Sequence, residues 1–256
     1  MTAVEIDRRF GGVARIHGPG ALEALATAHV VVVGVGGVGS WAAEALARSA
    51  VGRITLIDMD HVAESNINRQ IHALDSTLGR SKILAMAERI AAISPGCRVD
   101  CVDDFVDSAN VADLVPPRAD VVIDAIDSPA AKAALIALCV QRRQAVIACG
   151  GAGGRIDPFE LAQGDLAATR HDALLASVRS RLRREHGFPR AGNGRFGVSA
   201  IWCDAPAPPG LARADAGAGT PLACSGYGSL VTVTAPMGFA AASLALGRVL
   251  ALRGGR

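Results

Sequence analysis

Aromatic residues are scarce in this sequence, and its cysteines are not spaced as they are in structural zinc sites. Only nine of the 256 residues are Phe, Tyr or Trp. The six cysteines form no Cys-x-x-Cys pair, so neither a zinc-stabilised nor a disulfide-stapled domain is expected. Charged residues Glu5, Asp7, Arg8 and Arg9 interrupt the first ten positions, so no secretory signal is visible. We therefore expect a cytoplasmic protein.

Long apolar runs are also lacking, with one exception near the C-terminus. Residues 230–246 carry no charge, but they include Thr232, Thr234, Pro236 and Gly238. The run reaches only the shortest usual membrane span of roughly 17 residues. We expect a strand followed by a buried helix there, and no membrane span.

The sequence does contain a regular alternation of apolar strands and amphipathic helices. Half of the residues are hydrophobic and 29 are glycine, which suits an α/β protein with many strand-to-helix turns. Continuous Val and Ile runs are typical of parallel strands covered on both faces. The pattern predicts an α/β fold with a Rossmann-like, doubly wound, mostly parallel sheet and a C-terminal embellishment. The predicted strands lie near 30–35, 53–58, 98–102, 120–125 and 145–149, and the predicted helices near 40–49, 82–93, 109–114 and 129–143.

These elements suggest one domain over residues 1–256. Residues 1–27 precede the sheet and are interpreted as an N-terminal arm, and residues 28–160 hold the predicted nucleotide-binding sheet. After Gly150 the alternation of strand and helix patterns stops. Residues 161–256 are then the embellishment for substrate binding and dimerisation, with a Pro/Gly/Ala-rich, mobile loop at 205–221.

A glycine-rich turn follows the first predicted strand. The run Gly34-Val-Gly36-Gly37-Val-Gly39 leads directly into a predicted helix. Backbone N–H groups and the positive helix terminus then face the carboxyl end of the strand, where phosphates bind. Asp58 ends the next strand, where an acid accepts hydrogen bonds from ribose hydroxyls. A nucleotide site is predicted, and these features alone would favour NAD.

The next segment indicates a polyphosphate rather than a dinucleotide. Asn66, Arg69 and Gln70 follow the ribose acid closely, and Lys82 opens the next helix. An arginine and a lysine that converge on the β and γ phosphates would neutralise a pyrophosphate leaving group, and the two amides could orient phosphate or ribose. The alternative for Arg69 and Lys82 is a solvated loop.

A pair of aspartates follows the fourth predicted strand. Asp124 and Asp127 lie at the same edge of the sheet as the glycine-rich turn. A carboxylate there can hold Mg2+ against phosphates. The alternative for Asp127 is a helix N-cap, because Pro129 stands where a helix would begin.

Together these residues resemble the adenylation domain of the ubiquitin-activating-enzyme-like superfamily. The match covers residues 9–150 and rests on Gly-x-Gly-Gly-x-Gly, Asp58-x-Asp60, Ser-Asn66-x-Asn68-Arg69-Gln70, Lys82 and Asp124-x-x-Asp127. The resemblance implies that ATP is bound by the four glycines, Asp58, Asp60, Asn66, Asn68, Arg69, Gln70, Lys82 and Asp127. Within this set Asp58 would bind the ribose, Arg69 and Lys82 the triphosphate, and Asp127 magnesium. It also implies that an arginine of the arm, Arg15 or otherwise Arg9, reaches the ATP of a partner subunit.

Within that superfamily the chain resembles the tRNA threonylcarbamoyladenosine dehydratases. The similar segments are residues 9–15, 56–62, 102–106, 132–136 and 150–158. The resemblance implies an ATP- and Mg2+-dependent homodimer with shared active sites. It would cyclise threonylcarbamoyladenosine in tRNA by adenylating its carboxylate and releasing AMP on ring closure. Some members bind a monovalent cation, Na+ or K+. Whether a sulfur-transfer protein is a partner is left open.

Two other functions are weighed against this one. A sulfur-carrier adenylyltransferase would use the same site on the C-terminal glycine of a ubiquitin-like protein, but the Cys-x-x-Cys zinc pairs of many such enzymes are absent. An NAD-dependent oxidoreductase or a nucleotide sensor has no need of the Arg69, Lys82 and Asp127 set. The adenylating dehydratase is therefore preferred.

Two features of the C-terminal part remain. Residues 170–195 hold seven arginines against two acids, a net charge of +5, and we interpret Arg179, Arg181, Arg183 and Arg184 as tRNA-binding residues. The alternative is a solvated helix face. Cys224 has the most exposed setting of the cysteines and is a candidate reactive thiol, with packing as its alternative. The loop around it is a candidate cation site.

Overall fold

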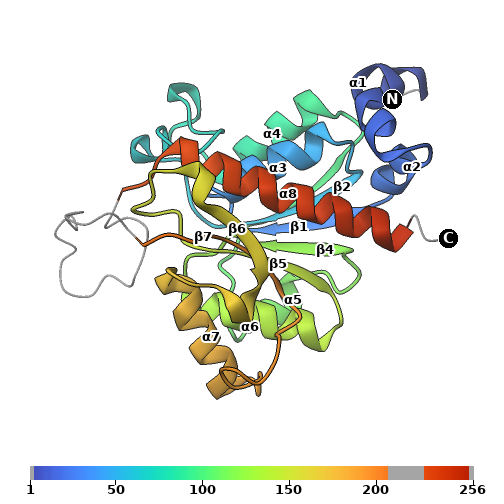
Figure 1. Cartoon of the computed structure of the whole chain (residues 1–256). Helices are drawn as coiled ribbons and strands as arrows, with labels where there is room; N and C mark the ends of the chain where they lie inside the picture. The colour runs from blue at the N-terminus through green and yellow to red at the C-terminus, as the bar shows by residue number, and fades with distance from the viewer. Residues whose placement is uncertain (1–2, 207–227, 254–256) are drawn as a thin grey trace.

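A seven-stranded sheet forms the centre of the molecule (Figure 1). The computed structural model describes residues 3–206 and 228–253. The strand order is β3-β2-β1-β4-β5-β7-β6, and all neighbours are parallel except β6 and β7. The predicted doubly wound, mostly parallel α/β sheet is confirmed. The strands are β1 (His29–Val33), β2 (Arg53–Ile57), β3 (Arg98–Val102), β4 (Val121–Asp124), β5 (Ala145–Cys149), β6 (Leu161–Asp165) and β7 (Ser199–Cys203).

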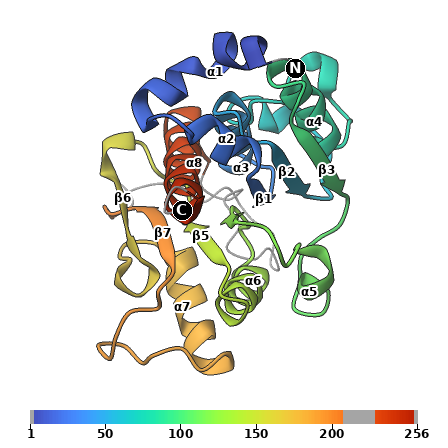
Figure 2. The ribbon, with the colours of Figure 1, turned by 90° about the vertical axis from the view of Figure 1, so that its right-hand side faces the viewer.

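Helices cover both faces of this sheet (Figures 1 and 2). One face carries α3 (Gly39–Arg48), α4 (Lys82–Ile93) and α8 (Val231–Arg253), and the other carries α5 (Val111–Leu114), α6 (Pro129–Gln141) and α7 (Ala173–Glu185). Four short 3-10 helices are also described: η1 (Glu64–Asn66), η2 (Asp75–Thr77), η3 (Pro158–Glu160) and η4 (Leu166–Ala168).

The apolar runs of the central strands divide between two cores. In β1, Val30 and Val32 pack into the core under α3, α4 and α8, whereas Val31 and Val33 pack into the core under α6 and α7. Successive side chains of a strand point to opposite faces. A strand buried on both sides therefore needs an uninterrupted apolar run, which is the pattern from which the sheet was predicted.

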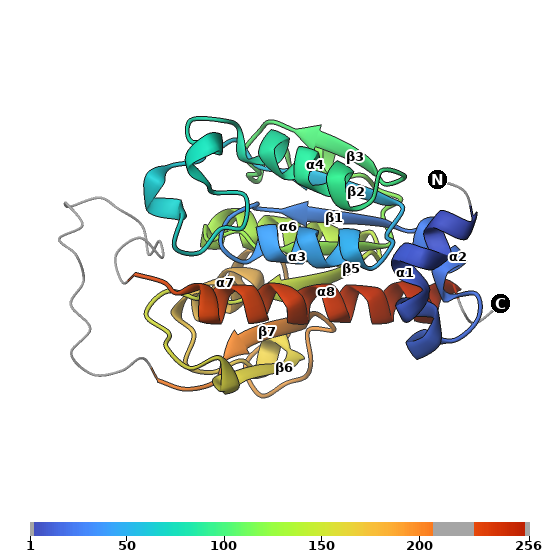
Figure 3. The ribbon, with the colours of Figure 1, turned by 90° about the horizontal axis from the view of Figure 1, so that it is seen from above.

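Residues 3–27, the described part of the segment interpreted as an N-terminal arm, are mostly helical. They form α1 (Ala3–His17) and α2 (Ala21–Ala26), which pack against each other, and α2 also contacts α8. Phe10 and Leu25 are buried, so part of this segment belongs to the core. Both helices lie beyond the amino ends of the strands (Figure 3).

Two strands after Gly150 were not predicted from the sequence. β7 adds to β5 in parallel, and β6 turns back antiparallel to it at the edge of the sheet. β6 has the sequence Leu-Ala-Gln-Gly-Asp, without a β-branched residue, and is mostly solvent-accessible. An edge strand needs little apolar surface, so its sequence carries little signal.

The charge-free run near the C-terminus forms a single helix. The prediction that a strand precedes this helix is wrong. α8 extends unbroken from Val231 to Arg253 with Pro236 inside it. The β-branched residues Val231 to Thr234 favour a strand locally, but packing on the sheet overrides that preference. Pro236 stands in the second turn, so it removes only one hydrogen bond near the helix start.

By length and hydropathy α8 is the one helix of the described residues that could cross a membrane. Core helices of soluble proteins meet the same criterion, and nine residues of α8 are buried against the rest of the chain. Of the loop predicted at 205–221, residues 207–221 lie outside the described residues, as does Cys224.

The glycine-rich turn after β1 is held from two sides at Val35. The Val35 amide donates to Asp58 Oδ2 at 2.6 Å, and its carbonyl lies 3.0 Å from His72 Nε2. Because a carbonyl only accepts, Nε2 carries the proton. Nδ1 of His72 is buried and has no partner among the described residues. Burial lowers the pKa of His72 to about 4, so the ring is neutral at pH 7.

We predict that His72 makes the fold sensitive to acid. The pKa is near 6.5 in the unfolded chain and about 4 when folded, so His72 favours the folded state fully above pH 6.5. As pH falls from 6.5 to 4 only the unfolded state takes up the proton, and roughly 3 kcal/mol of stability is lost. His72→Gln keeps a donor for Val35 and does not titrate. Urea unfolding of both proteins across this pH range should show a smaller loss of unfolding free energy for the variant than for the wild type. Equal losses would contradict the low folded-state pKa of His72.

Candidate active site

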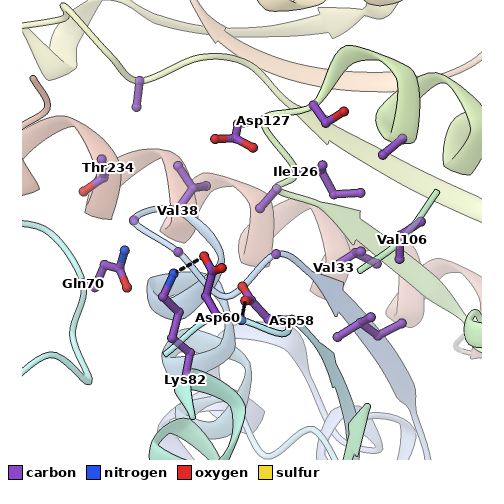
Figure 4. A pocket seen from close by; sticks show the side chains of 18 of the residues that line it. Val33, Val38, Asp58, Asp60, Gln70, Lys82, Val106, Ile126, Asp127 and Thr234 are labelled. Carbon is purple, nitrogen blue, oxygen red and sulfur yellow. Dashed lines mark hydrogen bonds and ion pairs between the residues drawn. The ribbon is translucent and has the colours of Figure 1, made fainter. Parts of the chain in front are cut away.

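A cavity of about 520 Å3 opens at the carboxyl ends of β1, β2 and β4 (Figure 4). β1 lies between β2 and β4 in the sheet, so the chain leaves β1 and β4 in opposite directions across the sheet. Such a switch point is where open α/β sheets bind ligands, because the loops on its two sides diverge.

Most of the residues expected to bind the nucleotide line this one cavity. Gly39, at the start of α3, and Asn68 do not line it; nor do Arg15 and the arginines of α7. The expected residues that do are Gly34, Gly36, Gly37, Asp58, Asp60, Asn66, Arg69, Gln70, Lys82 and Asp127.

Lys82 is a cavity residue that already has an ionic partner. Its Nζ lies 2.7 Å from Asp60 Oδ2 (Figure 4), and its side chain is only 7% exposed, against 52% for Asp60. The ammonium has two further donors, so it can bridge Asp60 and a phosphate. Lys82 is therefore not part of a solvated loop, which was the alternative interpretation.

Arg69 is a cation without a carboxylate partner among the described residues. Its guanidinium donates to the Ser65 carbonyl at 2.6 Å and to Asn68 Oδ1 at 3.0 Å. Its own carbonyl accepts a hydrogen bond from Trp41 Nε1 at 3.0 Å. The neighbouring Gln70 is buried, and its Oε1 has no partner among the described residues. The backbone here is fixed, while the Arg69 charge and the Gln70 oxygen remain free for a ligand.

The two asparagines of this segment have structural contacts. Asn66 Oδ1 accepts from the Ala63 amide at 3.1 Å and closes η1. Asn68 Nδ2 donates to the Ser229 carbonyl at 2.7 Å, which ties this loop to the segment that leads into α8. Of the two, only Asn66 lines the cavity.

Asp58 sits beneath the glycine-rich turn. Oδ1 accepts from the Asp60 amide at 2.8 Å, and Oδ2 accepts from Val35. Burial raises the pKa of Asp58, and the two amide hydrogen bonds and Lys82 oppose this. Each carboxylate oxygen has a second acceptor site, so the side chain can hold the turn and still accept from a ribose hydroxyl.

Asp127 is not the cap of the following helix. The N-cap of α6 is Ser128, and its side chain makes no capping bond. Asp127 is exposed and forms no hydrogen bond or ion pair with the described residues. Its carboxylate points toward the cavity (Figure 4) and is available to a cation.

The cavity also has lining residues that sequence reasoning missed. Val33, Ile57, Phe105, Val106 and Ile126 form an apolar wall, which suits a flat aromatic base. Phe105 and Val106 follow β3, so their place at the carboxyl end of a strand was the available signal. The remaining lining residues are Val38, Asp104, Ala125, Ser128, Ala131, Gly150, Ala152, Leu174, Ser229 and Thr234.

Arg15 cannot serve the cavity of its own chain. α1 lies beyond the amino ends of the strands, at the opposite end of the molecule from the cavity (Figures 1 and 3). Arg15 is exposed and makes no contact with a described hydrogen-bond or ionic partner, whereas Arg9 donates to the Ile93 carbonyl at 2.9 Å. Arg15 is therefore the freer of the two arginines.

The four arginines expected to bind tRNA divide into two pairs. Arg179 is half-buried and donates to Thr169 Oγ1, and burial lowers its pKa. Arg183 stacks 5.1 Å from the Phe196 ring centroid and donates to the Pro189 carbonyl. Arg181 and Arg184 both pair with Glu185 at the surface. The first pair supports the fold, and only the second is free to contact a large ligand.

The described residues contain no group of three or more His, Cys, Asp or Glu side chains that could hold a metal. A single carboxylate fits Mg2+, which often takes one or two protein carboxylates and completes its shell with phosphates and water. Burial raises the pKa of the Cys139 and Cys149 thiols to about 12 and that of Cys203 to about 11. These three thiols are therefore unsuited to act as nucleophiles at neutral pH.

Comparison with known proteins shows the family of the chain. Residues 7–250 match the model of the ThiF family. Over 95% of its length the chain is 47% identical to the tRNA threonylcarbamoyladenosine dehydratase of Escherichia coli, 94% of which is covered. The crystal structure of an E. coli tRNA N6-threonylcarbamoyladenosine dehydratase with ATP has a TM-score of 0.90 and 44% identity, and covers all of this chain and 99% of that one.

The related adenylyltransferases match less of the chain. The molybdopterin-synthase adenylyltransferase of E. coli is 36% identical over 117 residues, which are 46% of this chain and 47% of that protein. The near full-length likeness is to the dehydratases. The chain therefore belongs to the ThiF family and, within it, to the tRNA threonylcarbamoyladenosine dehydratases.

Proposed function

We propose that the protein uses ATP to adenylate the carboxylate of threonylcarbamoyladenosine in tRNA, and that ring closure then releases AMP. The observation that carries this proposal is the cavity between β1 and β4, which combines the glycine-rich turn with Arg69, Lys82 and Asp127. Likeness over nearly the whole chain to a dehydratase solved with ATP supports the choice of nucleotide and substrate.

The residues around the cavity suggest how the triphosphate is held. The amides of the glycine-rich turn and the start of α3 meet the phosphates, Asp58 accepts from the ribose, and the apolar wall receives the base. Arg69 and Lys82 neutralise the β and γ phosphates, which leave as pyrophosphate. Asp60 contributes indirectly to phosphate binding, because its carboxylate holds the Lys82 ammonium in place.

Asp127 is the proposed magnesium ligand. Its carboxylate is unpaired among the described residues and lines the cavity opposite Lys82 (Figure 4). A bound Mg2+ would offset phosphate charge as the α-phosphate is attacked. A monovalent cation, Na+ or K+, remains a proposal for the loop near Cys224, outside the described residues.

The chemistry follows from the poor leaving ability of hydroxide. A carboxylate oxygen attacks the α-phosphate of ATP, and pyrophosphate leaves to give an acyl-adenylate. A nitrogen of the neighbouring carbamoyl group then attacks the activated carbonyl carbon, loses a proton and expels AMP. The oxygen departs with AMP, so the nucleoside has lost one water. Because the nucleophile is part of the substrate, proximity replaces an enzyme nucleophile.

A homodimer with shared sites fits the position of the arm. Arg15 lies at the far end of its own chain from the cavity, so we propose that it completes the site of a partner subunit. Phe239 and Leu230 on the α8 side and Leu84 on α4 are exposed large apolar side chains. They give a second copy an apolar surface to bury.

The surface arginines of α7 suit the backbone of the RNA. Arg181 and Arg184 lie on the outer helix of one sheet face, and we propose that they contact phosphates, with Arg179 and Arg183 holding the helix in place. We further propose that residues 1–256 act as one adenylation domain, in the cytoplasm, where ATP and tRNA are available.

The first test is mass spectrometry of nucleosides from tRNA that carries threonylcarbamoyladenosine, incubated with the protein and Mg-ATP. We predict a product lighter by one water, with AMP and pyrophosphate released. Lys82→Met should abolish most turnover while the protein stays folded, and Arg48→Met, outside the cavity, should leave turnover unchanged. No product, but pyrophosphate exchange stimulated by a Gly-Gly-ended carrier protein, would move the assignment to the sulfur-carrier adenylyltransferases.

A second prediction concerns the shared site. Arg15→Ala and Asp127→Ala should each be inactive alone. Subunits mixed at random should regain about a quarter of wild-type turnover, because about half of the dimers are mixed and each mixed dimer has one intact site of two. Arg9→Ala mixed with Asp127→Ala is the matched control, since Arg9→Ala should be active by itself. Absence of rescue in the Arg15 mixture would argue against action across the dimer.

A third prediction concerns RNA. Arg181→Ala with Arg184→Ala should weaken tRNA binding and reduce the slope of log affinity against log salt by about 2, one phosphate contact per arginine. Arg48→Ala with Arg98→Ala removes two exposed arginines that lie on neither α7 nor the cavity lining, and it should leave the slope unchanged. Filter-binding titrations between 50 and 200 mM salt measure both. Identical slopes for the wild type and the α7 variant would mean that Arg181 and Arg184 belong to a solvated helix face that does not contact RNA.

A further inference from the structure

A lysine is buried beneath the loop that carries Asp127. Lys132, in the first turns of α6, has a fully buried side chain, as has its partner Asp124 at the end of β4. Nζ donates to Asp124 Oδ1 at 2.8 Å, to the Asp124 carbonyl at 2.9 Å and to the Ile126 carbonyl at 3.1 Å. An ammonium has three donors, so every one is used.

The two carbonyls that Lys132 binds lie on either side of Ala125, in a loop that faces the cavity. Ala125 donates its amide to the Val33 carbonyl at 2.9 Å. A Cβ placed on Gly34 would lie 2.8 Å from the Ala125 carbonyl oxygen, so the loop also touches the glycine-rich turn. Lys132 thus fixes the backbone immediately before Asp127, and that backbone supports the turn expected to hold phosphates.

Packing alone does not account for this lysine. Burying an ion pair costs several kcal/mol per ion, and apolar residues of similar volume often stabilise a core more. α6 already buries Ala131, Leu135, Ile136 and Cys139 against the sheet. What a fixed cation adds is a link between the carbonyl of Asp124, the last paired residue of β4, and that of Ile126 beyond it, where the sheet ladder no longer sets the path of the chain.

We infer that Lys132 is a positioning residue for the nucleotide site: its ammonium holds the loop before Asp127, so that the Asp127 carboxylate and the glycine-rich turn face the phosphates together. The inference rests on the proposed function, because it assigns Asp127 to the ATP site. Lys132 itself does not line the cavity and acts only through the loop.

A mutant cycle between Lys132 and Asp127 tests this inference. To avoid leaving a buried carboxylate unpaired, Lys132→Met is combined with Asp124→Asn, which removes both charges at nearly constant volume. We expect this pair to keep a melting temperature close to that of the wild type and to lower kcat at least tenfold, since a shift of about 1 Å in a catalytic group can cost ~100-fold. Because Asp127→Ala is expected to be inactive, the cycle itself is scored on the affinity for Mg-ATP, and in an Asp127→Ala background the same pair should cause little further loss of that affinity.

Ile136→Ala is the matched control, because Ile136 is fully buried on the same helix but contacts no loop carbonyl. It should lower the melting temperature while kcat, measured where the protein is folded, stays near wild type. If the pair does not fold, the cycle is run with Lys132→Gln, which keeps a donor. A folded variant with wild-type kcat, or equal losses with and without Asp127, would refute the inference. If the wild type dehydrates no tRNA, the proposed function fails, and the cycle, scored on Mg-ATP affinity, still tests the inference.

Discussion

The structure depends on the close approach of three backbone segments where β1 and β4 end. Gly34 has a φ of +84°, and a Cβ there would crowd the Ala125 carbonyl. Gly39 opens α3, where a Cβ would lie 1.8 Å from the Gly34 carbonyl oxygen. Only glycine meets these demands. At the glycine-rich turn the backbone itself therefore lines the cavity, which is the requirement for holding phosphates, while the loop after β4 adds the side chains of Ile126 and Asp127.

Charge is distributed around this backbone so that two groups stay available. Asp58 accepts hydrogen bonds from two backbone amides, Asp60 forms an ion pair with Lys82, and Asp124 forms an ion pair with Lys132. Arg69 and Asp127 are the two predicted charged cavity residues that have neither an ion pair nor, as Asp58 has, two backbone amides on a carboxylate, among the described residues. Under the proposed function, a triphosphate with its Mg2+ would supply both missing partners.

Much of this could be read from the sequence because parallel strands carry polar site residues directly after their apolar runs. Asp58 and Asp127 follow such runs, and so do Asp104 and Phe105, which the same reasoning could have included. Other features had no local signal. Thr234 and Ser229 reach the cavity from a segment far along the chain, and the Lys82–Asp60 pair joins residues 22 apart. β6 lacks the β-branched residues that mark the central strands, and the start of α8 has β-branched residues that favour a strand, although packing makes it helical.

The packing of α8 explains why its sequence is apolar and free of charge over most of its length. Gly238 packs so near the start of α3 that a Cβ there would lie 2.5 Å from the Val38 carbonyl oxygen. Ala241, Ala242 and Ala245 continue the buried face, and small residues are what allow two helices to approach to backbone distance. One turn before Gly238, the same approach brings Thr234 over Gly37, where a Cβ would lie 3.2 Å from the Thr234 methyl group. A helix that must both fill a core and close the cavity has little room for charge, so its apolar length follows from its place on the sheet and needs no membrane.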